Sequence, residues 1–342
     1  MQDRFLKACR RESVDCTPVW FMRQAGRYMK VFRALRERYS LLTVCKTPEL
    51  ATEVTLQPIN RFDLDAAILF SDILVPVEPM GLKLDFIKGE GPSIANPLRN
   101  KNDIEALRPV DPHSDLRFVI EAIQMIRPEI KIPLIGFAGA PFTLASYMIE
   151  GGPSRHYIRT KQMMYEASDA WDSLMQKLTT VLLDYLSAQA AAGADALQIF
   201  DSWIGILSPF DYRQYVLPYM KTLFSGLKKC GVPLIHFGTG TATLLSLQRE
   251  AGGDVIGLDW RINLDEGWKQ VGYDVAVQGN LDPVALLGPI SNIERQVNNI
   301  LMRANNRPGH IFNLGHGILP ETPEANLAAV IEMVHGKKIS PA

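Results

Sequence analysis

The sequence contains few cysteines and no excess of charge of either sign. Four cysteines occur among 342 residues, and no two of them form a CxxC pair. This usage argues against a disulfide framework or a zinc ribbon and indicates a reducing, cytosolic setting. The 36 basic and 37 acidic residues give a formal net charge of −1. The chain therefore has no overall basic field that would hold nucleic acid or an anionic membrane.

Long hydrophobic segments are also missing. The uncharged stretch 133–149 is interrupted by two prolines and two glycines, so it is too short and too broken to cross a bilayer. The first twenty residues lack the apolar core of a signal peptide, and they carry acidic residues, which are scarce in transit peptides. We therefore expect a cytoplasmic protein. A hydrophobic fraction of 47% provides a sizeable core and excludes extensive disorder.

Eight short apolar runs predict buried strands. The runs are continuous rather than alternating, as is typical of parallel strands that are covered on both faces. They are 18–22, 66–70, 133–139, 196–200, 233–238, 255–260, 275–280 and 310–316. Amphipathic helical patterns separate them, and the clearest runs from Trp171 to Ala192 and stops at Gly193. Further helical patterns cover 28–57 (stopping near Pro58), 115–127, 212–229, 291–305 and 323–335.

Eight strand–helix units in one chain predict a (β/α)8 TIM barrel of the α/β class. No linker or block of like charge divides the sequence, so we expect a single catalytic domain spanning 1–342. A doubly wound sheet is the alternative. That fold usually carries a glycine-rich GxGxxG turn after its first strand, whereas here the first run leads into MRQAGRY.

Barrel active sites lie at the carboxyl ends of the strands, so the residues that follow each run are the candidates. These positions hold two arginines, several acids, a tyrosine and a histidine. In chain order they are Arg23, Gln24, Arg27, Ser71, Asp72, Thr143, Tyr147, Asp201, Ser202, Asp259, Gln278, Asn280, Asn313 and His316. His236, Asp259 and Gln278 fit polar layers inside the barrel.

Each of the main candidates also has a structural explanation. Arg23 and Arg27 are either surface charges or an anion-binding pair, and their place directly after a buried strand favours the pair. Asp72 serves equally well as a helix N-cap. On pattern alone, His316 and Tyr147 fit core residues with satisfied polar atoms at least as well as site residues.

Several common catalytic motifs are missing. The sequence has no P-loop, no HExxH, no GxSxG and no tight His/Cys pair. No lysine follows a predicted strand, so a Schiff base is not favoured. The residues therefore indicate acid–base chemistry on an anionic ligand, without a cofactor or a metal.

Seven motifs in one order then make the sequence recognisable. They are PVWFMRQAGRYM, ILFSDIL, GFAGAPFTLASYMIEGG, LPYMK, GLDW, QGNLDP and NLGHG. Together they resemble the uroporphyrinogen decarboxylase family from about residue 2 to residue 336. The resemblance implies a barrel enzyme of porphyrin and haem biosynthesis that converts uroporphyrinogen III to coproporphyrinogen III and CO2, commonly as a homodimer.

The resemblance also assigns roles to residues of this chain. It implies catalytic roles for Arg23, Asp72 and Tyr147. The residues implied to bind substrate are Arg23, Gln24, Ala25, Gly26, Arg27, Asp72, Tyr147, Ser202 and His316. Asp72 would accept hydrogen bonds from the pyrrole N–H groups and stabilise a cationic intermediate, and Tyr147 would orient the reacting acetate. The proton donor would be an arginine of the pair or a water molecule that it holds.

Two other functions have to be weighed. Zinc- and cobalamin-linked methyltransferases share this barrel and bind zinc through a His-x-Cys pair after the fifth strand. The corresponding residues here are His236, Phe237 and Gly238, so the second ligand is missing. The remaining alternative is a protein that binds tetrapyrroles without turning them over.

Overall fold

The computed structural model describes residues 3–87 and 91–337, and its centre is a seven-stranded parallel sheet. The order is β1-β4-β5-β6-β7-β8-β9, and every neighbouring pair is parallel. The strands are β1 Ala67–Ile68, β4 Leu134–Gly139, β5 Ala196–Asp201, β6 Leu234–Gly238, β7 Val255–Gly257, β8 Ala276–Gln278 and β9 His310–Ile311. Nearly all their residues are buried, which explains why the runs are continuously apolar.

The segment around Val19 joins the two edges of this sheet. Val19 forms a parallel bridge with Phe312, and the Phe312 N–H donates to Pro18 O at 2.8 Å. On the other side, the Asp65 N–H donates to Val19 O at 2.9 Å, while the Asp65 carboxylate accepts from the Val19 N–H. A side chain thus replaces part of the backbone ladder. The curled parallel sheet confirms the predicted barrel, with the first run seen as a bridge.

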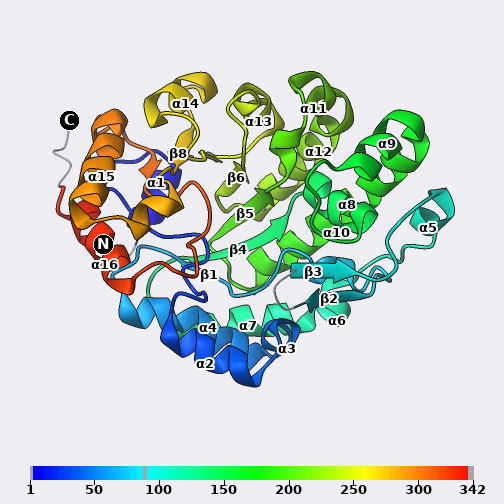
Figure 1. The fold of residues 1–342 in the computed structure, drawn as a ribbon, viewed down its shortest axis with the longest axis horizontal. Coiled ribbons are helices and arrows are strands. Elements are labelled where there is room, and N and C mark those ends of the chain that lie inside the picture. Colours follow the sequence, from blue (N-terminus) through cyan, green and yellow to red (C-terminus); the bar gives the residue numbers. More distant parts are fainter. Residues whose placement is uncertain (1–2, 88–90, 338–342) are drawn as a thin grey trace.

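Helices surround the central strands (Figure 1). The first eight are α1 Arg4–Cys9, α2 Lys30–Arg38, α3 Leu41–Lys46, α4 Pro48–Arg61, α5 Lys101–Glu105, α6 Pro112–Asp115, α7 Arg117–Ile126 and α8 Pro141–Glu150. The others are α9 Ile158–Glu166, α10 Ser168–Ala192, α11 Pro209–Tyr215, α12 Leu217–Leu227, α13 Leu245–Ala251, α14 Leu264–Val271, α15 Ile290–Ala304 and α16 Glu324–His335. None of these helices is long and apolar enough to cross a membrane.

The predicted long helix is confirmed as α10. It begins three residues before the predicted Trp171 and ends at Ala192. Gly193 follows with a φ of +121°, and a Cβ there would lie 2.8 Å from Cγ of Arg127. Glycine is therefore required both by the backbone conformation and by the close approach of α7's end.

The prediction for 28–57 is wrong in detail. Three helices occupy this region, and Pro58 lies inside α4, which continues to Arg61. Ser40 separates α2 from α3 by accepting a hydrogen bond from the Thr43 N–H, a typical N-cap. Pro58 is tolerated close to the helix end, where its carbonyl still accepts from the Phe62 N–H at 2.9 Å.

A β-hairpin that the sequence pattern did not predict lies beside the central strands (Figure 1). It pairs β2 Leu84–Ile87 with β3 Gly91–Ile94 in antiparallel register. The expectation of one domain over 1–342 stays a prediction, because residues 1–2, 88–90 and 338–342 lie outside the described part of the chain.

Candidate active site

Arg23, Asp72 and Tyr147 come from three separate elements and share one electrostatic environment. Arg23 follows the Val19 segment, Asp72 follows β1, and Tyr147 lies on α8 directly after β4. The Arg23 side chain reaches the surface, yet partial desolvation by the surrounding protein lowers its pKa, whereas Asp72 and Tyr147 act to raise it. In turn, Arg23 counteracts the rise in the pKa of Asp72 and of Tyr147. The three predicted catalytic residues therefore lie near enough to one another for each to influence the pKa of at least one of the others.

Two glycines shape the surroundings of Arg23. Its φ is +61°, an unusual value for a residue with a side chain. A Cβ at Gly26 would lie 2.8 Å from the backbone oxygen of Arg23, so the turn between the two arginines has no room for a side chain there. A Cβ at Gly317 would lie 2.4 Å from Cδ of Arg23. The Arg23 side chain thus runs directly over the glycine that follows His316.

Asp72 has one carboxylate oxygen in use. Its Oδ1 accepts from the Leu74 N–H at 2.9 Å, just before the short 3-10 helix Val75–Val77. This contact closes a local turn before the 3-10 helix, whose N-cap is Leu74, so the N-cap role that the sequence left open for Asp72 is wrong. Within residues 3–87 and 91–337, no cation forms an ion pair with Asp72. Burial raises its pKa, and the Leu74 N–H and Arg23 only partly offset this effect.

Tyr147 lies on the buried face of α8, packed against Trp203. The two rings lie 5.7 Å apart, and Trp203 also packs against Tyr157 at 5.8 Å. Burial and the neighbouring Asp72 raise the pKa of Tyr147 to about 12. The phenol therefore stays protonated near neutral pH and can donate a hydrogen bond, although its ring also contributes to packing.

His316 is held between two glycines that both make close contacts. A Cβ at Gly315 would lie 2.4 Å from the Trp260 backbone nitrogen, and Gly317 faces Arg23. Burial, together with Arg23 and Arg261, lowers the pKa of His316 to about 4. Its imidazole is therefore neutral at physiological pH, with one ring nitrogen able to donate and the other to accept.

Of the remaining predicted residues, some lie toward the surface and others are buried. Arg27 is exposed, and Ser202 is half-buried directly after β5. Gln24 is buried instead, with Oε1 accepting from the Phe21 N–H and Nε2 donating to Ala66 O, both at 3.1 Å. Its amide thus ties the Arg23 loop to the start of β1. Ala25 is also buried.

Comparison with known proteins decides the family. The family model of uroporphyrinogen decarboxylase matches residues 1–337. The chain is 57% identical over 337 residues to the uroporphyrinogen decarboxylase of Sorangium cellulosum, covering 98% of this chain and 96% of that protein. The chain belongs to the uroporphyrinogen decarboxylase family. The corresponding protein of Carboxydothermus hydrogenoformans is 56% identical over 337 residues, with the same coverage. The resemblance read from the motifs is thus confirmed.

More distant proteins of known structure share the fold of this uroporphyrinogen decarboxylase family member. A methyltransferase from Methanosarcina mazei superposes with a TM-score of 0.82 at 23% identity, covering 98% of each chain. A B12-independent methionine synthase from Shewanella gives a TM-score of 0.59 at 12% identity, covering 84% of this chain and 88% of the other. At such identities the likeness concerns the barrel-like fold alone.

His236 does not form part of a His-x-Cys pair, and its side chain does not face the barrel interior. The prediction that this residue faces the barrel interior is wrong, because its ring lies 4.9 Å from Phe224 on α12, in the helix layer. Strand pairing explains the error. Ile235 pairs with Gln198, whose side chain bonds Gln278 inside the barrel, so the next residue points outward. Across the described ranges, no three His, Cys, Asp or Glu side chains gather closely enough to hold a metal ion.

One basic residue near the site was missed by the sequence pattern. Arg261 follows Trp260 one position beyond the end of the sixth predicted strand, and its charge contributes to the lowered pKa of His316. Reading one residue further at each strand end would have included it. Asp201 was noted at a strand end, but nothing in the sequence indicated that Thr143 would be its hydrogen-bond partner at 2.8 Å.

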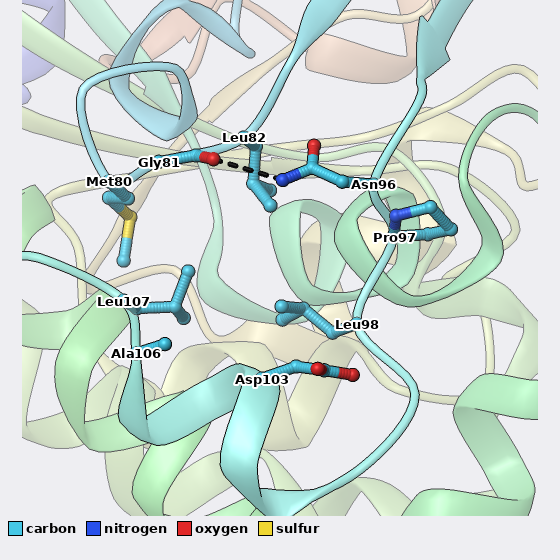
Figure 2. A pocket seen from close by; sticks show the side chains of 9 residues that line it. All are labelled: Met80, Gly81, Leu82, Asn96, Pro97, Leu98, Asp103, Ala106 and Leu107. Atoms are coloured by element: carbon cyan, nitrogen blue, oxygen red, sulfur yellow. Dashed lines mark hydrogen bonds between the residues drawn. The ribbon is translucent and has the colours of Figure 1, made fainter.

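A cavity of about 220 Å3 lies elsewhere, between the hairpin region and α5 (Figure 2). Its lining is mostly apolar, and Asn96 spans one side by donating to Gly81 O at 3.0 Å. The single acid there, Asp103, is already engaged as an acceptor for the Arg99 and Asn100 N–H groups. This cavity therefore offers no unpaired charge that could act on an anionic substrate.

Proposed function

We propose that this member of the family decarboxylates the four acetate side chains of uroporphyrinogen III to methyl groups, giving coproporphyrinogen III and CO2, at the mouth of its barrel. Family membership over residues 1–337 supports the reaction. The shared electrostatic environment of Arg23, Asp72 and Tyr147 is the observation that supports the site.

In this proposal, Arg23 and the polar groups around it bind the carboxylates of the substrate. Uroporphyrinogen carries eight carboxylates, and the planar guanidinium of arginine binds carboxylates through two parallel hydrogen bonds. Arg23 has no acidic partner within 4 Å among the described residues and thus keeps its donors for a ligand. Arg27, Ser202 and neutral His316 would hold further carboxylates at the rim.

Asp72 would accept hydrogen bonds from the four pyrrole N–H groups at the centre of the macrocycle. Desolvation raises the pKa of this half-buried carboxyl, so water stabilises its ionised form less than it would at an open surface. Bound N–H donors would replace water and favour the carboxylate. That carboxylate then faces the positive charge that develops on the pyrrole ring, and such preorganised charge is a large contributor to catalysis.

The chemistry needs only protons and the substrate's own ring. A proton adds to the ring carbon next to the one that bears the acetate and makes the pyrrole an iminium-like cation, whose positive charge extends to the acetate-bearing carbon. The bond between the methylene carbon and the carboxylate then breaks, CO2 leaves, and the electron pair neutralises the cation. A proton adds to the exocyclic carbon, the ring carbon loses its proton, and a methyl group remains. Arg23, or a water molecule that it holds, supplies the proton, and Tyr147 orients the acetate.

The proposal also includes a cytoplasmic homodimer. Four unpaired cysteines and a net charge of −1 support a reducing compartment without a nucleic-acid or membrane partner. The dimer rests on the family resemblance. Analytical ultracentrifugation of the purified protein checks it, with a sedimentation mass near twice 38.2 kDa expected and a mass of one chain contradicting it.

The test is an anaerobic assay of the purified protein with uroporphyrinogen III. We expect coproporphyrinogen III and four equivalents of CO2 with no added cofactor, and the same rate after dialysis against EDTA. Binding without CO2 release would instead support a tetrapyrrole carrier. Activity lost on EDTA treatment and restored by zinc alone would contradict the metal-free reaction and revive a zinc enzyme.

A further inference from the structure

Arg261 is held rigidly beside the mouth of the barrel. Its guanidinium carbon lies 3.9 Å from the centre of the Trp260 ring, a cation–π arrangement. One guanidinium nitrogen donates to Asp259, which is almost fully buried, whereas the Arg261 side chain is 50% exposed. The inner edge of the guanidinium is therefore anchored and its outer edge faces solvent.

The loop that carries His316 lies against both the Trp260–Arg261 segment and Arg23. Gly315 packs against the backbone of Trp260, and Gly317 packs against the side chain of Arg23. Both arginines lower the pKa of His316, which places both charges near its ring. Two cations with free donors and a neutral histidine thus meet at one part of the rim.

The ion pair with buried Asp259 is a structural role, but it accounts for only part of this arrangement. Asp259 already accepts hydrogen bonds from the Gly240 N–H at 2.6 Å and the Arg261 N–H at 3.0 Å. The Arg261 side chain gives it only one further donor, Nη1, out of five on the guanidinium. Stacking on Trp260 instead fixes the orientation of the remaining donors, which lowers the entropy lost when they bind a ligand.

We propose that Arg261 is a substrate-binding residue that takes a side-chain carboxylate of the tetrapyrrole, on the same part of the rim as Arg23 and His316. The inference rests on the proposed function, because that function supplies a ligand with carboxylates around its whole circumference. Arg261 would thereby fix the orientation of the macrocycle in the mouth. Trp260 is its supporting surface, and Asp259 is its anchor.

The variants that test this are Arg261→Gln and Arg261→Lys, with Arg249→Gln as a matched control. The Arg249→Gln change also removes one charge and one ion pair, the pair with Asp274 at 2.6 Å. Arg249, however, lies on α13, and its partner lies in the loop before β8. We expect Arg261→Gln to raise KM for uroporphyrinogen III about tenfold with kcat changed less than threefold. Arg261→Lys should recover part of the loss, and Arg249→Gln should match the wild type.

A binding measurement separates this inference from the proposed function. Uroporphyrin III, the oxidised octacarboxylate, is titrated against each variant by fluorescence. If Arg261→Gln binds uroporphyrin III more weakly than the wild type, Arg249→Gln does not, and the circular dichroism spectrum is native, the carboxylate site is supported whether or not turnover is seen. Equal affinity and equal KM for Arg261→Gln and wild type would overturn it. Absence of turnover in the wild type would contradict only the proposed function.

Discussion

Thr143 on α8 donates a hydrogen bond of 2.8 Å to Asp201 at the end of β5. The same hydroxyl accepts from the backbone N–H of Trp203 at 3.3 Å. Tyr147 lies one helical turn beyond Thr143, with its ring against Trp203. This hydroxyl therefore joins the helix that carries Tyr147 to the loop that carries Ser202.

Thr143→Val should lower both stability and turnover. The change keeps the shape of the side chain but leaves the buried Asp201 carboxyl without a partner, at a cost of about 1–3 kcal/mol. Tyr147 would then lose part of its alignment, so we expect kcat to fall several-fold with a smaller change in KM. Thr143→Ser keeps the hydroxyl and should retain wild-type kinetics. Thermal unfolding and steady-state kinetics of both variants check this. Wild-type kcat in Thr143→Val would argue against the positioning role.

Asp201 makes stability depend on pH. Burial raises its pKa from 3.8 to about 7, and its second oxygen has no hydrogen-bond partner in the described structure. As pH rises, the unfolded chain loses this proton near 3.8 and the folded chain only near 7. Asp201 therefore destabilises the fold increasingly over that window and by a constant amount above it.

The Asp201→Asn variant isolates this effect. The amide keeps an oxygen acceptor for Thr143 but cannot ionise. The Tm of Asp201→Asn should therefore rise relative to the Tm of the wild type as pH increases from about 4 to about 7. Scanning calorimetry of both proteins across pH 4–8 gives the difference directly, because the other titrating groups cancel. A difference in Tm that stays constant with pH would refute the raised pKa.

Gly317→Ala should impair substrate binding through Arg23. An added Cβ would lie 2.4 Å from Cδ and 2.7 Å from Cγ of that arginine, so the side chain must move. We expect kcat/KM to fall at least about tenfold, equivalent to roughly 1.4 kcal/mol. Gly288→Ala is the control, since its φ of −85° suits alanine and its nearest contact is 3.3 Å. Wild-type kcat/KM in folded Gly317→Ala would mean that the position of Arg23 is unimportant.

The strand runs and the candidate residues were predictable from the sequence because they depend on local pattern. Continuous apolar runs mark covered parallel strands, and polar residues at their ends mark the mouth. Arg23, Asp72 and Tyr147 accordingly appear both among the candidates from the sequence and in the candidate site of the structure. Sequence motifs beyond this local pattern also carried the family assignment, which the comparisons confirm.

The errors came from contacts between distant segments. The outward direction of His236 depends on the register of β6 against β5. The link between Val19 and the segment before β1 depends on a carboxylate, Asp65, that takes the place of a backbone partner. The close packing of the His316 loop against Trp260 and Arg23 depends on Gly315 and Gly317, which follow β9. Spacing along one chain does not contain such information, because each contact joins segments far apart in sequence.

The charge of Asp72 is the centre of the proposed mechanism, and Asp72→Asn tests it most directly. Asparagine is nearly isosteric and its carbonyl can still accept from the Leu74 N–H, so this turn contact of 2.9 Å should survive. Only the negative charge facing the ring cation is lost. The measurement is single-turnover decarboxylation of uroporphyrinogen III together with its Kd. We predict that the rate falls about 10²–10³-fold, while affinity changes much less. A folded Asp72→Asn variant that decarboxylates at the wild-type rate would contradict the account and leave Asp72 as a structural residue of the turn before the 3-10 helix.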